Sequence, residues 1–229
     1  MTDRRMIAPL WHTCIVFILY LAIYSLSAIR LGGHDLSSIV KDVPERVVLV
    51  ICLDILIVLV VSLGLLFNET AIHDVFGERW AHRSHWLKDI IFGVFLSIIM
   101  FGIDLLITTI VPSSTSKFTP ALNPRSEFDL VMELLLAVSG GFSEEVIFRG
   151  YFLRQIQSLT GSDGIALLGQ GVLFVLAHGL HQELAGVMVE YSLGLIFGLV
   201  VIKRKSLLPA MVAHTLVDGF AFVLEFCMR

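Results

Sequence analysis

Long apolar runs separated by short polar segments are the feature that most constrains how this chain can fold. A helix needs about 20 apolar residues to cross the hydrocarbon core of a bilayer. Apolar runs comparable to this length occupy residues 7–29, 47–67, 90–111, 129–157, 165–180, 184–202 and 207–226. Because a backbone in lipid must satisfy its own hydrogen bonds, each run is predicted to be a helix. We therefore predict an all-α fold, a polytopic transmembrane helical bundle of about seven spans, with six to eight compatible with the pattern.

The charge content supports this class and excludes others. Charged residues make up 16% of the chain, whereas a soluble domain carries about a quarter. The sequence contains no basic cluster and no glycine-rich phosphate loop, so no nucleic-acid partner is predicted. The lipid bilayer is the expected surrounding of a multi-pass, integral membrane protein. We expect a single membrane domain in which residues 1–127 hold the first three spans and residues 128–229 hold the last four.

Ionisable side chains inside the apolar runs are concentrated in the second half of the chain. Each such group costs about 2.5–3.5 kcal/mol at the centre of a membrane helix, so these residues usually have a function. The first three runs contain only Asp54 and Asp104. The last four contain Glu133, Glu144, Glu145, Arg149, His178, Glu190, His214, Asp218 and Glu225. The catalytic core is therefore expected in the last four spans.

The segment GGFSEEVIFRGYF, residues 140–152, places two carboxylates beside each other. Glu145 and Arg149 are four residues apart, so they share one face of a helix and can form an ion pair. Glu144 points about 100° away from Glu145 and is left as the candidate reactive carboxylate. Glycines at positions 140, 141 and 150 allow close helix approach or leave room for a substrate. The alternative is a cluster of ion pairs that only orients the helices.

Two further pairs carry histidine at a spacing of four residues. Phe174 can pack beside His178 and fix its ring, although a single histidine at the end of a span is more often structural. Asp218 lies on the same helix face as His214 and is predicted to accept the imidazole Nδ1 proton, which would orient the ring. The alternative for this second pair is a buried hydrogen bond that ties two helices together.

These residues together have the composition of a hydrolytic site. Glu144 and His214 both lie about 12–15 Å along their spans, at a rise of 1.5 Å per residue, so they can meet with His178. A carboxylate and two imidazoles can activate water and stabilise an oxyanion. As an alternative, Glu144, His178 and His214 could bind a divalent metal such as zinc. The sequence lacks the HExxH motif of soluble zinc proteases, so no metal ligand or cofactor is assigned.

The three motifs, taken in order, resemble the signature of the CPBP intramembrane proteases. That family includes the CAAX prenyl endopeptidases and the bacterial Abi proteins. The resemblance covers about residues 130–225. It rests on Glu144-Glu145-x-x-x-Arg149, Phe174-x-x-x-His178 and His214-x-x-x-Asp218.

The resemblance implies a role for each motif residue in an intramembrane endopeptidase. Glu144 would activate the hydrolytic water with assistance from His178, and His214 would form the oxyanion site with the residue at position 218. Glu145 and Arg149 would support this geometry. The last motif commonly ends in Asn, whereas this chain has Asp218, which cannot donate a hydrogen bond unless it is protonated. Members of the family are often described as metalloproteases, but a metal-free glutamate mechanism suits these residues as well.

The resemblance suggests a substrate class and a location but leaves the function open. The expected substrate is a peptide or a membrane protein, prenylated in the eukaryotic members, and the short loops favour the plasma membrane of a bacterium. One alternative is a non-catalytic membrane scaffold or bacteriocin self-immunity protein that retains the polar cluster for packing. An ion-coupled transporter is less favoured, because such transporters are often built from two repeats, whereas the charges here lie in one half of the chain.

Overall fold

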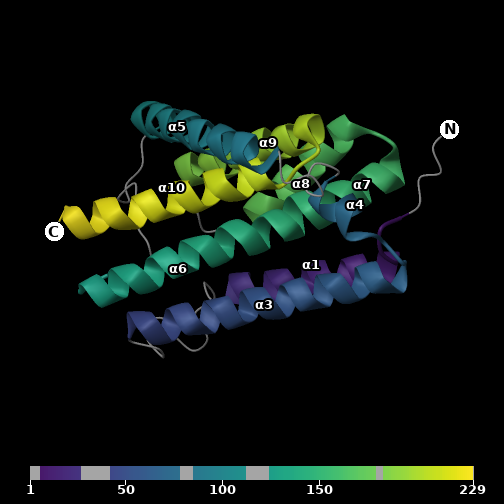
Figure 1. The fold of residues 1–229 in the computed structure, drawn as a ribbon, viewed down its shortest axis with the longest axis horizontal. Coiled ribbons are helices and arrows are strands. Elements are labelled where there is room, and N and C mark those ends of the chain that lie inside the picture. The colour runs from purple at the N-terminus through teal and green to yellow at the C-terminus, as the bar shows by residue number, and fades with distance from the viewer. Residues whose placement is uncertain (1–5, 27–41, 78–84, 112–123, 179–182, 229) are drawn as a thin grey trace.

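The described part of the chain is a bundle of helices. A computed structural model describes residues 6–26, 42–77, 85–111, 124–178 and 183–228, and every regular element in these ranges is helical. The first helices are α1 (Leu10–Leu26), α3 (Val43–Phe67), α4 (Ile72–Phe76) and α5 (Trp86–Ile110). They are followed by α6 (Glu127–Glu144), η3 (Glu145–Phe152), α7 (Leu153–Thr160), α8 (Asp163–Ala177), α9 (Leu184–Arg204) and α10 (Leu208–Cys227). The long helices lie nearly side by side along one axis (Figure 1).

In the described part of the chain, four helices are long and apolar enough to cross a bilayer, namely α3, α5, α9 and α10. Together they support an integral membrane protein. The first and fifth predicted spans correspond to the shorter apolar helices α1 and α8, and the fourth corresponds to the continuous stretch from α6 through η3 to α7. The structure therefore supports four of the seven predicted spans by length and composition, and the other three stay predictions.

Local sequence signals explain where these helices begin and end. α3 begins at Val43, before the predicted start at residue 47, because Pro44 is tolerated in the first turn of a helix. α6 begins with a capping box, in which the Asp129 amide donates to Ser126 Oγ and the Ser126 amide donates to the Asp129 carboxylate. α7 ends at Gly161, whose φ of 71° is in the left-handed region. The predicted break between the fourth and fifth runs is confirmed.

Helix α10 lies between α5 and α6, while α8 packs on α9 and α3 packs on α6 (Figure 1). At one end of the bundle, Arg204 of α9 donates to the carboxylate of Asp89 of α5 over 2.7 Å. There the Leu207 amide also donates to the Phe76 carbonyl, which ties α4 to the turn between α9 and α10. These contacts fix the start of α10, the helix that carries His214.

The predicted close approach at the glycines is confirmed for two of the three positions. A Cβ at Gly141 would overlap the hydroxyl of Thr215 on α10, and a Cβ at Gly150 would lie 2.7 Å from Val75. Among the described residues, apart from the adjacent turns of α6 itself, no atom lies within 4 Å of the Cβ position at Gly140. The two neighbouring glycines of α6 therefore have different roles, and only Gly141 is required by the contact with α10.

Alanine substitutions at these two glycines test that contact. Gly141→Ala is expected to destabilise the protein by about 1–3 kcal/mol, because α6 and α10 must move apart. Gly140→Ala is the matched control and should be neutral or stabilising by up to about 1 kcal/mol, because alanine favours a helix. Unfolding of the purified protein in detergent measures both changes. Equal effects of the two substitutions would contradict the close packing at Gly141.

Candidate active site

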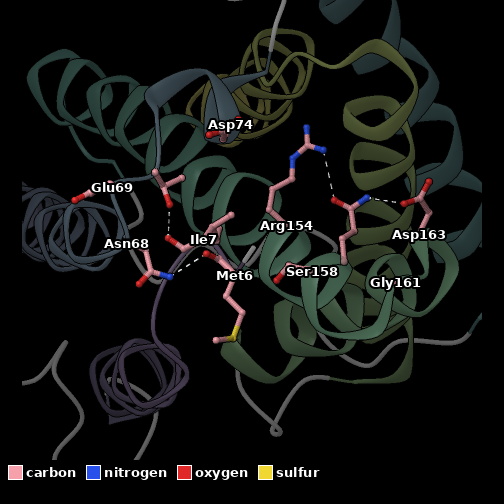
Figure 2. Close-up of a pocket in the computed structure, with 11 residues that line it drawn as sticks. Met6, Ile7, Asn68, Glu69, Asp74, Arg154, Ser158, Gly161 and Asp163 are labelled. Atoms are coloured by element: carbon pink, nitrogen blue, oxygen red, sulfur yellow. Dashed lines mark hydrogen bonds between the residues drawn. The ribbon is translucent and has the colours of Figure 1, made fainter. Parts of the chain in front are cut away.

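A pocket of about 510 Å3 lies near the start of α1 and does not contain the predicted site (Figure 2). Its lining includes Met6, Asn68, Asp74, Arg154 and Asp163, and none of the residues of the three motifs. The motif residues instead lie in the buried polar cluster around Glu144.

The two adjacent glutamates lie where the helix changes its geometry. Glu144 is the last residue of α6, and the next eight residues, Glu145–Phe152, form the π-helix η3, in which every residue is buried. A π-helix is rare and occurs frequently at functional sites. The spacing of the motif predicts an α-helix through this segment, whereas the structure has the wider turns of a π-helix from Glu145 to Phe152.

The predicted ion pair between Glu145 and Arg149 is confirmed. Arg149 Nη1 donates to Glu145 Oε1 over 2.8 Å, and neither side chain is exposed. The other end of the guanidinium donates to the Leu193 carbonyl over 3.2 Å, and its carbon lies 4.3 Å from the centre of the Phe174 ring. A buried charge is stable only when it is paired and hydrogen-bonded, and Arg149 meets both conditions.

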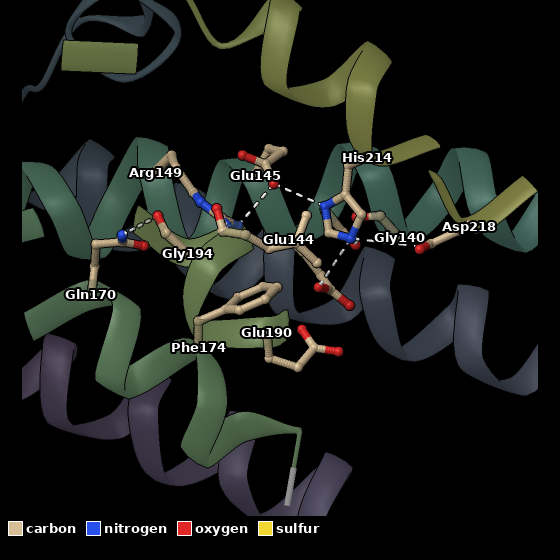
Figure 3. A network of polar contacts seen from close by, with 12 residues as sticks. Gly140, Glu144, Glu145, Arg149, Gln170, Phe174, Glu190, Gly194, His214 and Asp218 are labelled. Atoms are coloured by element: carbon tan, nitrogen blue, oxygen red, sulfur yellow. Dashed lines mark hydrogen bonds and ion pairs between the residues drawn. The ribbon is translucent and has the colours of Figure 1, made fainter. Parts of the chain in front are cut away.

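His214 is held by Glu145 and not by Asp218, which corrects the sequence prediction. His214 Nδ1 lies 2.8 Å from Glu145 Oε1, the oxygen that also accepts from Arg149 (Figure 3). Asp218 Oδ2 instead lies 3.6 Å from His214 Nε2, which is beyond hydrogen-bond distance. The predicted spacing did bring Asp218 to the same imidazole, but to its other nitrogen. Because a carboxylate only accepts, the geometry assigns a proton to Nδ1.

His178 lies at the end of α8 and is fixed by the residue one turn before it. Its Nδ1 lies 2.9 Å from the Phe174 carbonyl oxygen, and the two rings are 4.4 Å apart, as the sequence predicted. A carbonyl can only accept, so the proton again lies on Nδ1. The Nε2 atom of His178 therefore faces the carboxylates around it.

Glu144 lies at the centre of the cluster. Its Oε2 is 3.6 Å from His178 Nε2 and 3.8 Å from His214 Nε2. The Glu144 side chain is 14% exposed, between the enclosed Glu145 and the Asp218 side chain, which is 37% exposed. The structure thus brings together all the predicted site residues: Glu144, Glu145, Arg149, Phe174, His178, His214 and Asp218.

Two carboxylates beside this cluster were not assigned to the site from the sequence. Glu190 of α9 places Oε2 3.9 Å from His178 Nε2, on a helix that carries none of the three motifs. Asp54 of α3 accepts from the hydroxyl of Ser139, which precedes Glu144 on α6. Glu190 and Asp54 are both charged residues inside apolar runs, and this is the signal in the sequence that could identify them.

The arrangement of the described residues does not support the alternative in which Glu144, His178 and His214 bind a metal ion. Among them, no group of three or more His, Cys, Asp or Glu side chains is arranged to hold a metal ion. We derive no step through a metal.

Comparison with known families supports the assignment made from the motifs. The model of the type II CAAX prenyl endopeptidase Rce1-like family matches residues 126–220. This family is the one that the motifs resemble, and the match includes all three of them. The match begins at the cap of α6 and includes every residue of the cluster, whereas α1, α3 and α5 lie outside it. No curated protein and no solved structure gives a significant match.

Removal of the guanidinium should show how strongly the cluster depends on Arg149. Arg149→Met leaves Glu145 buried with only His214 as a partner, and we expect a loss of about 3–5 kcal/mol of stability. The double variant Glu145→Gln, Arg149→Met should recover part of this loss. Arg154→Met, at a more exposed position on α7, serves as the control and should cost less than about 1 kcal/mol. Unfolding midpoints of the three variants and the unsubstituted chain in detergent measure these effects, and an Arg149→Met protein as stable as the control would contradict this account.

Proposed function

We propose that this protein is an intramembrane endopeptidase of the CPBP type, in which Glu144 activates the water that hydrolyses a peptide bond. The observation that carries the proposal is the position of Glu144 Oε2 between the Nε2 atoms of His178 and His214. These separations exceed hydrogen-bond distance, so a water bonded to Glu144 can lie within reach of both imidazoles. The match to a protease family supports the same reaction class.

In the proposed reaction each group has a step that its contacts support. Glu144 accepts a proton from water, and the resulting hydroxide attacks the carbonyl carbon of the scissile bond. An imidazole that carries a proton on Nε2 donates to the oxyanion of the tetrahedral intermediate. Glu144 then returns its proton to the leaving amine as the C–N bond breaks. Glu145 keeps His214 oriented, because its Oε1 lies against Nδ1 of that ring.

The nearby carboxylates supply charge that balances a protonated imidazole. Glu190 lies 3.9 Å from Nε2 of His178, and Asp218 lies 3.6 Å from Nε2 of His214. With Nδ1 of each ring already engaged, Nε2 is the nitrogen that can face substrate. Both histidines are therefore proposed as oxyanion donors.

The substrate and the location are part of this proposal. The family description names a prenyl endopeptidase, which supports a peptide or membrane protein with a prenylated cysteine as the substrate class. The short loops of the sequence favour a bacterial plasma membrane as the location.

Replacement of Glu144 by glutamine tests the hydrolytic role. Glu144→Gln keeps the size of the side chain but removes the base, so cleavage should fall by about 100-fold or more. Purified protein in lipid vesicles is incubated with membrane-anchored peptides, with and without a prenylated cysteine, and the products are identified by mass spectrometry.

The control is Glu127→Gln, an exposed carboxylate at the start of the same helix, and it should cleave like the unsubstituted chain. Unfolding midpoints establish that both variants are folded. If Glu144→Gln cleaves as well as this control, the protein is not a glutamate protease of the proposed kind, and a packing role for the cluster is favoured.

Asparagine at position 218 tests the corrected role of that residue. Because Asp218 does not hold Nδ1 of His214, Asp218→Asn removes only the charge beside Nε2 and should lower the activity less than Glu145→Gln does; its amide can also donate to an oxyanion. Initial rates on the best-cleaved peptide measure this effect, with Glu145→Gln as the comparison that removes the carboxylate facing Nδ1. A large loss in Asp218→Asn combined with full activity in Glu145→Gln would reverse the two roles.

A further inference from the structure

The first helix of the chain makes a buried hydrogen-bonded contact with the π-helix of the candidate active site. His12 Nδ1 of α1 lies 2.8 Å from the hydroxyl of Tyr151, and Thr13 Oγ1 lies 3.1 Å from the same hydroxyl. Tyr151 belongs to η3 and follows Arg149 by two residues. His12 and Tyr151 are both buried. α1 lies outside residues 126–220, the part of the chain that matches the protease family.

The directions of these hydrogen bonds follow from the chemistry of their partners. His12 Nε2 lies 2.9 Å from the Val60 carbonyl of α3, which only accepts, so Nε2 carries the proton. In a neutral ring Nδ1 is then the acceptor, and the Tyr151 hydroxyl donates to it. His12 thereby joins three helical segments, since it bonds α3 on one side of the ring and η3 on the other.

A glutamine one turn beyond Tyr151 extends this contact to the start of α1. Gln155 of α7 accepts from the amides of Ile7 and Ala8 through Oε1, and its Nε2 donates to the Ala8 carbonyl and to Thr13 Oγ1. Gln155 is fully buried. These hydrogen bonds hold the start of α1 against α7, which continues directly from η3.

Aromatic contacts continue the same interface toward the catalytic cluster. Tyr20 of α1 packs edge-on against Phe148 of η3, with ring centres 5.1 Å apart. Phe148 in turn packs against Phe174, the ring that covers Arg149 and lies beside His178. The face of α1 that carries His12, Val16 and Tyr20 therefore covers the side of η3 that supports the cluster.

From these contacts we propose that His12 and Tyr151 are positioning residues for the candidate active site. A π-helical stretch of eight residues needs external contacts, because the π-helix is rare and usually restricted to a single turn. The hydrogen bond from Tyr151 to His12 holds the end of η3 in place, and with it the position of Arg149 and Glu145 relative to His214. α1 thus contributes to catalysis without touching substrate, although it lies outside the family match.

Replacement of the tyrosine by phenylalanine removes the hydroxyl and leaves the ring. Tyr151→Phe is expected to lower kcat by about 10- to 100-fold with little change in KM, because a small displacement of catalytic groups has an effect of this size. This readout rests on the proposed function and uses the best-cleaved peptide of the panel described above. Tyr191→Phe is the control, because Tyr191 packs against Gly171 where α9 meets α8 and is not part of the contact between α1 and η3.

Two substitutions of His12 separate positioning from packing. His12→Gln retains a donor and an acceptor and should restore much of the kcat that His12→Leu loses. Unfolding midpoints show whether each variant is folded at the assay temperature. If Tyr151→Phe and His12→Leu lower the midpoint but keep kcat per folded molecule, their role is structural only and the proposal is overturned.

A measurement that does not depend on cleavage tests the geometric part of the proposal. Hydrogen exchange of the amides from Val146 to Phe152 should be at least about tenfold faster in Tyr151→Phe than in Tyr191→Phe. Unchanged exchange would overturn the proposal whether or not the protein cleaves peptides. Faster exchange in a chain that cleaves none of the peptides would place the failure in the proposed protease function and leave the contact between α1 and η3 supported.

Discussion

The polar cluster depends on the two contacts that the buried Glu145 carboxylate makes. One oxygen, Oε1, accepts from Arg149 and faces Nδ1 of His214, each over 2.8 Å. The first contact lies within η3, whereas the second reaches α10, so a single buried atom joins the π-helix to a helix that follows it by more than fifty residues. Glu144 can lie between two imidazoles because its neighbour already holds one of them and the arginine. Glu145, which makes the two short contacts, is therefore not the residue proposed to react; that residue is Glu144.

Much of this arrangement follows from patterns that the sequence displays directly. Apolar length predicted the helices that became α3, α5, α9 and α10, because the requirement of a bilayer for about 20 residues does not depend on tertiary structure. The spacing of four predicted the pairing of Glu145 with Arg149 and the packing of Phe174 on His178, because both pairs lie within one helical turn. The charges inside apolar runs pointed to the half of the chain that holds the polar cluster, because an ionisable group in an apolar run needs a polar partner.

The parts that were wrong or unforeseen depend on contacts between helices. The choice of Glu145 over Asp218 as the partner of His214 Nδ1 depends on how α10 crosses α6, and spacing along α10 gives no information on that. The π-helix was unforeseen because its stability comes from partners outside the segment. His12 reads in sequence as a single histidine in an apolar run, and only its bonds to Val60 and Tyr151 reveal a role. Glu190 approaches His178 for a similar reason, since it comes from a helix without a motif.

The bond between His214 and Glu145 also limits how a substrate can reach Glu144. Gly141 allows Thr215 to lie directly against α6, so α6 and α10 are in close contact one turn before Glu145. Separation of α6 from α10 would break the contact between His214 Nδ1 and Glu145 Oε1. The proposed site therefore cannot open between these two helices without losing the position of His214. On the other side of Glu144, His178 at the end of α8 lies between Glu144 and Glu190 of α9, so those two helices supply the remaining groups of the cluster. In the proposed protease, the contact between α6 and α10 is therefore the part of the site that must stay closed while substrate binds.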